Sequence, residues 1–268
     1  MTLVDYNPLI AQSPEEVPLE RAPLASVVAQ VRFPSILAIG EDKKFIAAFQ
    51  ESIRSSYPIL EPEQSRTVLI DAKGTPSISD QMIWRFVDSK GLWRVSLGTD
   101  FLSLETNEYL GRSVFLERLE SILKDLEEHV KPSMNSRFGL RYINRINCEN
   151  IEHISQFVRP EVAGIITSEF EKNVHQSISE SIFLLPENQG RILTRWGLVS
   201  ANTTIDPILV EPVDSRSWIL DLDVSTSIRK EFDVEGLMSD AKRFSERIYT
   251  FFRWAVTEDF LKHFGGEI

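Results

Sequence analysis

The chain has 268 residues, of which 42% are hydrophobic and 26% charged, and its formal net charge is −11. These proportions are typical of a globular protein with a large core, and the excess of acid disfavours general binding to nucleic acid. No uncharged apolar run approaches ~18 residues and the N-terminus lacks a signal-peptide pattern, so no membrane segment is expected. The single cysteine, Cys148, cannot form an internal disulfide and favours a reducing cytoplasmic location.

Residues 1–24 are predicted to form an extended N-terminal arm. Prolines recur in this segment at Pro8, Pro14 and Pro18, and each one disfavours a helix. The arm also carries acidic residues and has no lysine or arginine before Arg21.

Residues 25–150 are predicted to form an N-terminal α+β lobe. Ala25–Phe33 alternates at period two and predicts a strand, while Phe45 and Phe49 lie on one side of a predicted helix over Asp42–Ser55. The remaining predictions are strands at Arg66–Asp71, Met82–Asp88, Leu92–Gly98, Phe101–Thr106 and Ser136–Asn147, a loop over Lys73–Asp80, and a helix capped by Asn107 that runs to Val130.

Residues 151–268 are predicted to form a C-terminal α+β lobe. Its strands are expected at Val174–Leu184, Arg191–Ala201 and Trp218–Ser225. A long helix is expected from about Asp233, with a new cap at Thr257 before the Gly265-Gly266 stop. Its predicted core stripe consists of Leu237, Ala241, Phe244, Ile248, Phe251 and Ala255.

The predicted fold class is α+β. Each half offers antiparallel strands followed by a long helix, so we expect curved antiparallel sheets packed on long helices, in two loosely similar βββα-type halves.

Common catalytic signatures do not occur in the sequence. It has no glycine-rich phosphate loop, no dinucleotide fingerprint, no zinc-protease helix and no nucleophile elbow. The four histidines share no metal-ligand spacing. The sequence therefore predicts no metal site and no cofactor, and it identifies no catalytic residue.

The most distinctive segment is an arginine-bearing strand. Arg137, Arg141 and Arg145 recur at every fourth position and share one strand face. Such guanidiniums could receive a phosphate or carboxylate ligand, or they could pair with acids on a neighbouring strand, for example Glu105 or Asp223.

Two further patterns carry weaker hypotheses. Asp221 and Asp223 share a strand face and could act in acid–base or metal chemistry, although an acidic face exposed to solvent gives the same pattern. His175 shares a face with Ser177, Ser179 and Ser181, which indicates a solvated strand face more than a nucleophile.

The C-terminal helix is rich in aromatic residues. Phe252 and Trp254 turn away from the line of Phe244 and Phe251. Core burial is the ordinary explanation, and contact with a second chain is the alternative, because aromatic residues are enriched in interface cores.

Three segments carry a resemblance to a known family. The segments are ASVVAQVRFP at 25–34, WRVSLGTDFLSLET at 93–106 and RFGLRYINRI at 137–146. With VTEDF at 256–260, they resemble an uncharacterised, sporadically distributed bacterial protein family of about this length. The resemblance implies no activity or cofactor, and its patchy distribution implies mobile genes such as defence or toxin–antitoxin modules.

Three functions follow from these observations. The favoured one is a non-enzymatic binding or assembly module. Its partner would be another protein or a second copy of the chain, which would make a homodimer. The alternative is a small-ligand protein or enzyme with a pocket between curved sheet and long helix, whose candidate polar groups are Arg141, Tyr142, Asn144 and Arg145. The weaker alternative is recognition of a nucleotide or nucleic acid by the arginine-bearing strand, which the net charge disfavours.

Overall fold

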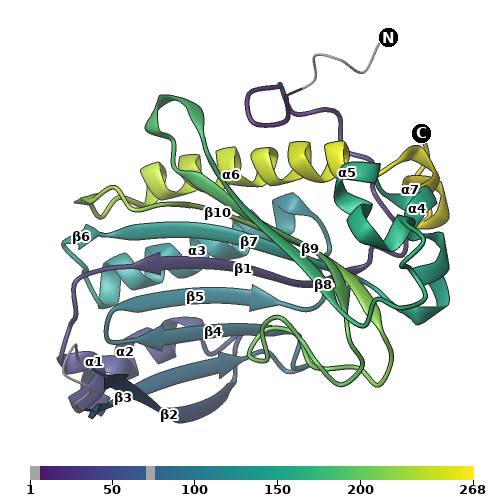
Figure 1. The fold of residues 1–268 in the computed structure, drawn as a ribbon. Coiled ribbons are helices and arrows are strands. Elements are labelled where there is room, and N and C mark those ends of the chain that lie inside the picture. The colour runs from purple at the N-terminus through teal and green to yellow at the C-terminus, as the bar shows by residue number, and fades with distance from the viewer. Residues whose placement is uncertain (1–6, 71–75) are drawn as a thin grey trace. The chain divides into compact units, whose positions relative to one another are not determined.

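The structure, a computed structural model, describes residues 7–70 and 76–268 (Figure 1). It has a mixed α+β fold with a large antiparallel sheet of nine strands, in the order β2-β3-β4-β5-β1-β7-β10-β9-β8. This confirms the predicted α+β class and the antiparallel sheet, whereas the two similar halves stay a prediction. Among the described residues, no helix is long and apolar enough to span a lipid bilayer.

Strands β6 and β11 form a separate two-stranded sheet. The strands are β1 (Leu24–Arg32), β2 (Ile59–Ile70), β3 (Pro76–Val87), β4 (Trp93–Gly98), β5 (Phe101–Thr106), β6 (Met134–Asn135), β7 (Arg137–Ile146), β8 (Ser177–Leu184), β9 (Arg191–Val199), β10 (Ser217–Thr226) and β11 (Lys230–Glu231). The helices are α1 (Ala38–Glu41), α2 (Lys43–Ile53), α3 (Arg112–His129), α4 (Ile154–Phe157), α5 (Pro160–Ala163), α6 (Val234–Ala255) and α7 (Glu258–His263).

The chain divides into two compact units that are not consecutive in sequence. One unit comprises residues 1–27, 139–226 and 241–268, and the other comprises residues 28–138 and 227–240. The two lobes that the sequence predicts, with a boundary near residue 150, stay a prediction.

In the unit built from residues 28–138 and 227–240, helices α2 and α3 pack on strands β3 to β5. Phe49 of α2 contacts Phe86 at 5.7 Å between ring centroids, and Phe115 of α3 contacts Trp93 at 5.8 Å. All four rings are buried. Amphipathic helices have thus covered one sheet face with aromatic side chains, as their period predicts.

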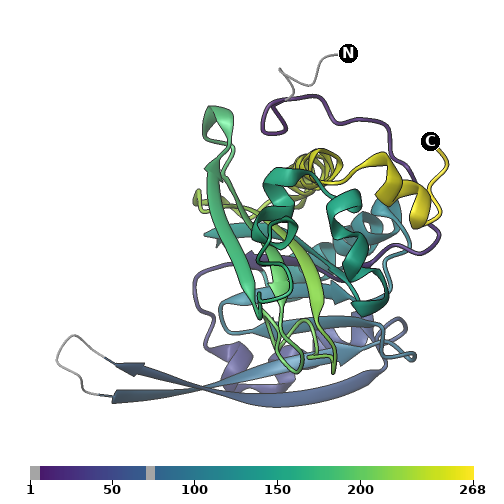
Figure 2. The same ribbon diagram turned by 45° about the vertical axis from the view of Figure 1, so that its right-hand side comes forward.

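Strands β2 and β3 form a longer hairpin than the sequence predicts. β3 pairs with β4 through Trp84–Val87 alone, so its earlier residues continue with β2 as a twisted two-stranded ribbon (Figure 2). The predicted loop over Lys73–Asp80 is wrong for residues 76–80, which belong to β3, and residues 73–75 lie outside the described part. Many residues in this ribbon are polar, so the sequence lacks the hydrophobic alternation that would indicate a strand there.

The predicted start of α3 at Asn107 is also wrong. Thr106 accepts a hydrogen bond from the Glu108 N–H at 3.0 Å, which forms a local turn where the helix was expected. The helix begins at Arg112, after Gly111 with φ 134°, a backbone conformation that favours glycine.

We predict that Asp125→Asn raises the melting temperature at neutral pH. Burial in α3 raises the pKa of Asp125, although a hydrogen bond from Ser52 partly opposes that shift. The ionised carboxylate therefore destabilises the fold above its folded pKa, and this cost disappears as the pH falls towards the ordinary value of 3.8. Melting curves of both proteins across this range measure the effect.

The matched control is Glu127→Gln on the exposed side of the same helix. An equal gain in both variants would assign the effect to net charge and contradict the prediction.

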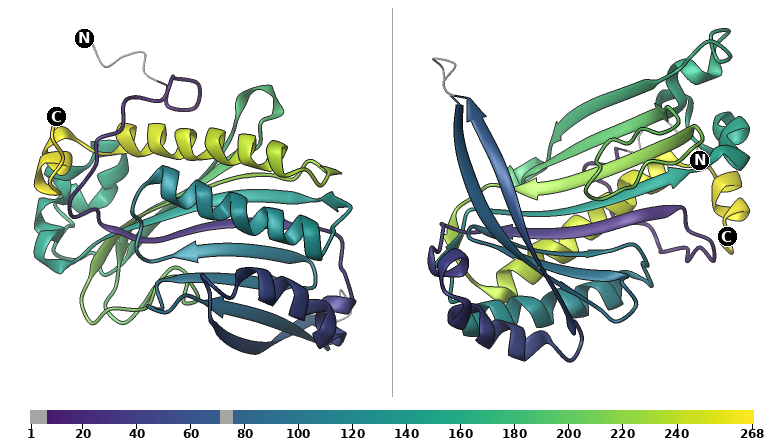
Figure 3. Two further views of the ribbon diagram at one scale, coloured as in Figure 1. Left: turned by 180° about the vertical axis from the view of Figure 1, so that it is seen from behind. Right: turned by 90° about the horizontal axis from the view of Figure 1, so that it is seen from below.

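In the other unit, α6 packs on one face of strands β8, β9 and β10. Phe183 of β8 contacts Phe251 of α6 at 5.9 Å, and Trp218 and Leu222 of β10 are buried on the same face. The N-terminal arm runs along the outside of α6 (Figure 3, left). It is held there by side chains of the helix, since Arg247 donates to the Pro8 carbonyl at 2.6 Å and Tyr249 accepts from the Val17 N–H at 2.7 Å.

The C-terminal helix follows the sequence prediction closely. Asp233 caps its start by accepting from the N–H groups of Glu235 and Gly236. The whole predicted stripe is buried, and Thr257 caps α7 by accepting from the Phe260 N–H at 3.3 Å.

We predict that Phe244→Ala lowers the free energy of unfolding by about 3–5 kcal/mol, because it removes a fully buried aromatic side chain. Urea denaturation followed by circular dichroism measures the loss. Lys242→Ala, on the exposed side of the same helix, serves as the control. Similar losses in the two variants would show that the predicted stripe is not what anchors α6.

Candidate functional site

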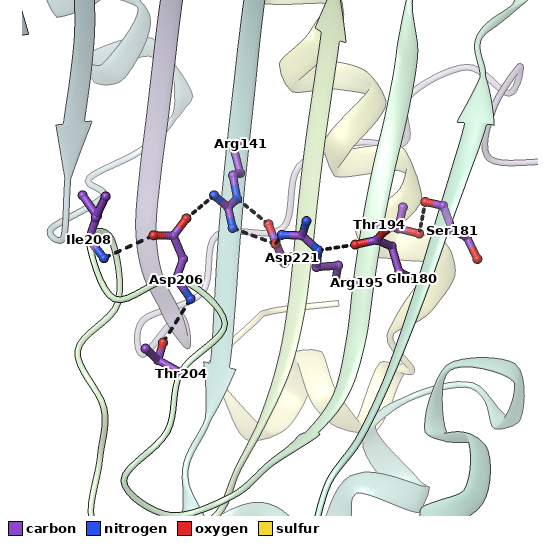
Figure 4. Close-up of polar contacts among 9 residues, drawn as sticks. All are labelled: Arg141, Glu180, Ser181, Thr194, Arg195, Thr204, Asp206, Ile208 and Asp221. Atoms are coloured by element: carbon purple, nitrogen blue, oxygen red, sulfur yellow. Dashed lines mark hydrogen bonds and ion pairs between the residues drawn. The ribbon is translucent and has the colours of Figure 1, made fainter. Parts of the chain in front are cut away.

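Five charged side chains cross four neighbouring strands on the sheet face opposite α6 (Figure 4). In the order in which they meet, this charge ladder consists of Asp206, Arg141, Asp221, Arg195 and Glu180. Arg141 lies on β7, Asp221 on β10, Arg195 on β9 and Glu180 on β8, while Asp206 belongs to the segment between β9 and β10.

Strand register places these groups together. Asp221 lies directly opposite Arg195, and Arg195 lies directly opposite Glu180. Residues that face each other across antiparallel strands point to the same side of the sheet, so all three side chains share one face. Phe183 has the opposite parity on β8 and points to α6, which assigns the charge ladder to the other face.

The centre of the charge ladder is a two-pronged ion pair between Arg141 and Asp221. Arg141 donates from Nε to Oδ1 at 2.8 Å and from Nη2 to Oδ2 at 2.9 Å. Its Nη1 donates to Asp206 Oδ2 at 2.7 Å. Arg195 lies 3.5 Å from the second oxygen of Asp221 and donates to Glu180 at 2.6 Å.

Exposure rises from the centre of the charge ladder towards β8. The side chains of Asp221 and Arg141 are 2% and 16% exposed, whereas those of Arg195 and Glu180 are 30% and 52% exposed. Burial acts to lower the pKa of Arg141, but the hydrogen bonds and charge of Asp221 and then Asp206 outweigh it, so its pKa is raised. The guanidinium therefore stays charged, and an anionic ligand would have to displace Asp221 to reach it.

The other residues of the arginine-bearing strand do not converge on one point. Arg137 donates to Gln30 at 3.3 Å, and Arg145 donates to the carbonyl of Glu211 at 2.7 Å. Burial lowers the pKa of Arg145, and the charge of Glu211 opposes that shift. Tyr142 and Asn144 have the opposite parity and are buried on the other face, where Asn144 donates to the Leu220 carbonyl at 3.3 Å.

For the acidic pair on β10, Asp221 and Asp223, the sequence favours a strand face exposed to solvent. Asp221 is 1% exposed, so that expectation is wrong for this residue. The partner of Arg141 is Asp221, whereas the sequence suggested Glu105 or Asp223. Glu105 pairs with Arg94 of β4 instead. His175 is exposed but precedes β8, so it shares no strand face with the serines. Ser177, Ser179 and Ser181 lie on the same face of β8 as Phe183, which points to α6, although all three are at least partly exposed.

The two interface candidates on α6 are half-buried and contact aromatic residues of their own chain. Phe252 lies 5.5 Å from Phe260, and Trp254 lies 5.0 Å from Phe251. The guanidinium of Arg159 also stacks over Trp254 at 5.6 Å.

Beside the exposed end of the charge ladder, β8 presents apolar side chains to solvent. Ile178, Ile182 and Leu184 are 37%, 55% and 80% exposed. They alternate with residues of the α6 face, so they share the face of Glu180. β8 is the last strand in the sheet order, and among residues 7–70 and 76–268 no strand pairs with its open edge.

Sequence reasoning missed Arg195, Glu180 and Asp206. A signal for the first two exists, because Glu180 and Arg195 lie at equal distances from the hairpin connection at residues 185–190 and therefore pair across it. Asp206 comes from an irregular segment, and no local pattern links it to Arg141.

In the part of the chain that the structure describes, no group of three or more histidine, cysteine, aspartate or glutamate residues is placed to hold a metal ion. The side chain of Cys148 lies outside the described residues. Neither a scan against protein-family models nor a search of curated proteins found a match to the chain.

We predict that Arg141→Ala lowers the free energy of unfolding by about 3–5 kcal/mol, because it leaves the buried Asp221 carboxylate without its main partner. Arg145→Ala, which removes one exposed hydrogen bond from the same strand, should cost about 1 kcal/mol. Urea denaturation measures both.

A double variant tests the cause of this loss. Replacing the pair with apolar groups, as in Arg141→Met with Asp221→Leu, should recover most of the stability, since no buried charge is left unpaired. If the double variant is less stable than Arg141→Ala, the loss does not arise from the orphaned carboxylate.

Proposed function

We propose that the chain is a non-enzymatic binding or assembly module of the cytoplasm that contacts a protein partner through β8. The contact surface, called the β8 surface below, consists of Ile178, Glu180, Ile182 and Leu184 together with the open backbone edge of this strand.

The exposure of the β8 surface is the observation that carries this proposal. Soluble proteins protect edge strands with lysine, proline, bulges or covering segments, because an open edge pairs with other chains. β8 has the sequence SISESIFL, which contains neither lysine nor proline. Its most exposed large apolar residue, Leu184, is 80% exposed, which favours a surface that another protein covers.

The charge ladder supports a structural role for the arginine-bearing strand. Arg141 uses Nε, Nη1 and Nη2 to bind carboxylates of its own chain, and its side chain is 16% exposed. The geometry therefore favours a rigid platform for β8 over a ligand site at Arg141.

Photo-crosslinking in the native cells tests the proposal. A photoreactive amino acid at Leu184 should give a covalent adduct with a protein that mass spectrometry identifies. The same amino acid at Glu161, an exposed position on α5, is the control and should give none.

A second substitution in the β8 surface tests whether the photo-crosslink at position 184 depends on that surface. Ile182→Glu should remove the adduct formed at position 184, because it puts a charge in the middle of the apolar contact. An adduct that survives this change, or equal labelling from positions 161 and 184, would contradict the proposed function.

A further inference from the structure

We infer that the partner of β8 is β8 of a second copy of this chain, paired antiparallel across a twofold axis. This inference rests on the proposed function and specifies its partner. The two sheets would join edge to edge, and Glu180 of each copy would lie opposite Ile182 of the other.

The backbone of β8 is arranged for such pairing. Leu185, at the end of the strand, donates its N–H to the Gly190 carbonyl of the hairpin at 2.9 Å. Hydrogen-bonded pairs alternate along antiparallel strands, so the odd-numbered residues from Ser177 to Phe183 bond to β9. The even-numbered residues from Ile178 to Leu184 therefore direct their N–H and C=O groups to the open edge.

Charge and length select one register for two copies of β8. Centring the pair on Glu180 would place two like charges opposite each other, which is destabilising. Centring it on Ile182 would shorten the paired segment, because Ile178 would then lie opposite Pro186, which has no N–H to donate. Centring it on Ser181 avoids both costs and places Ile178 opposite Leu184 of the second copy, so that apolar side chains meet at both ends.

Charge within β8 favours a second copy over a basic or acidic partner. Glu180 is its one charged residue, and its carboxylate is bound by Arg195 at 2.6 Å. The β8 surface is thus locally neutral in a chain of net charge −11. Two copies therefore meet without local repulsion, whereas a strongly basic partner would find no unpaired acid here.

Disulfide formation reports the register. In the proposed dimer the two Ser181 residues form a non-hydrogen-bonded pair with Cα atoms about 4.5 Å apart, inside the range of ~4.4–6.8 Å that a disulfide spans. Ser181→Cys, in a Cys148→Ser background, should give a covalent dimer under mild oxidation. Ser179→Cys is the matched control, because its two copies would lie about 14 Å apart.

Substitutions at Ile182 test whether this position lies opposite Glu180 of the second copy. Ile182→Glu places a carboxylate opposite Glu180 of the second copy and should raise the dissociation constant at least about tenfold in sedimentation equilibrium. Ile182→Lys offers Glu180 an opposite charge and should weaken the dimer less. Ile182 is 55% exposed, so both variants should keep the melting temperature of a dilute, monomeric sample.

The outcomes separate this inference from the proposed function. A reversible dimer, with a disulfide from Ser181→Cys and none from Ser179→Cys, supports self-pairing. Equal oxidation of the two cysteine variants, or a monomer at every concentration, overturns it. If the photo-crosslink from position 184 identifies a different protein, the proposed function stands and self-pairing is wrong. If no adduct forms, both are wrong.

Discussion

The unit that contains residues 139–226 depends most on the buried ion pair between Arg141 and Asp221. A carboxylate that is 2% exposed is tolerated because both of its oxygens accept from one guanidinium. A slip of one residue would turn Asp221 to the apolar α6 face, where Leu220 and Leu222 are buried. The pair therefore specifies the register of β10 against β7, even though an apolar pair of similar size could be equally stable.

On the same sheet face, the exposure of the side chains increases from this ion pair towards β8. The segment between β9 and β10 contacts β7, because Asp206 binds Arg141 (Figure 4) and the Glu211 carbonyl accepts from Arg145. At the far end of the charge ladder, Glu180 is 52% exposed. The face is thus divided into a part held by buried ion pairs and a part that leaves apolar side chains exposed.

The predictability of the fold and of the candidate site depends on how local each signal is. The stripe on α6 and the cap at Thr257 follow from spacing within one segment, and both were predicted correctly. The burial of Asp221 could not be predicted, because it depends on Arg141, 80 residues away, and on Asp206 in an irregular segment. Alternation indicated that Asp221 differs from its neighbours but not which face would be covered.

β8 is the element in which hydrophobic alternation and burial disagree. Its alternation would turn Ile178 and Ile182 inward, yet both are exposed, and the serines share the α6 face with Phe183. Phe183 is the large apolar anchor on that face, so its contact with Phe251 sets the orientation of the strand. The isoleucines are then left exposed on the opposite face, where the proposed dimer would bring them beside the apolar side chains of a second copy. That proposed antiparallel pair would use the open edge of β8 in both copies, and it would therefore close the assembly at two instead of propagating a fibre through that edge.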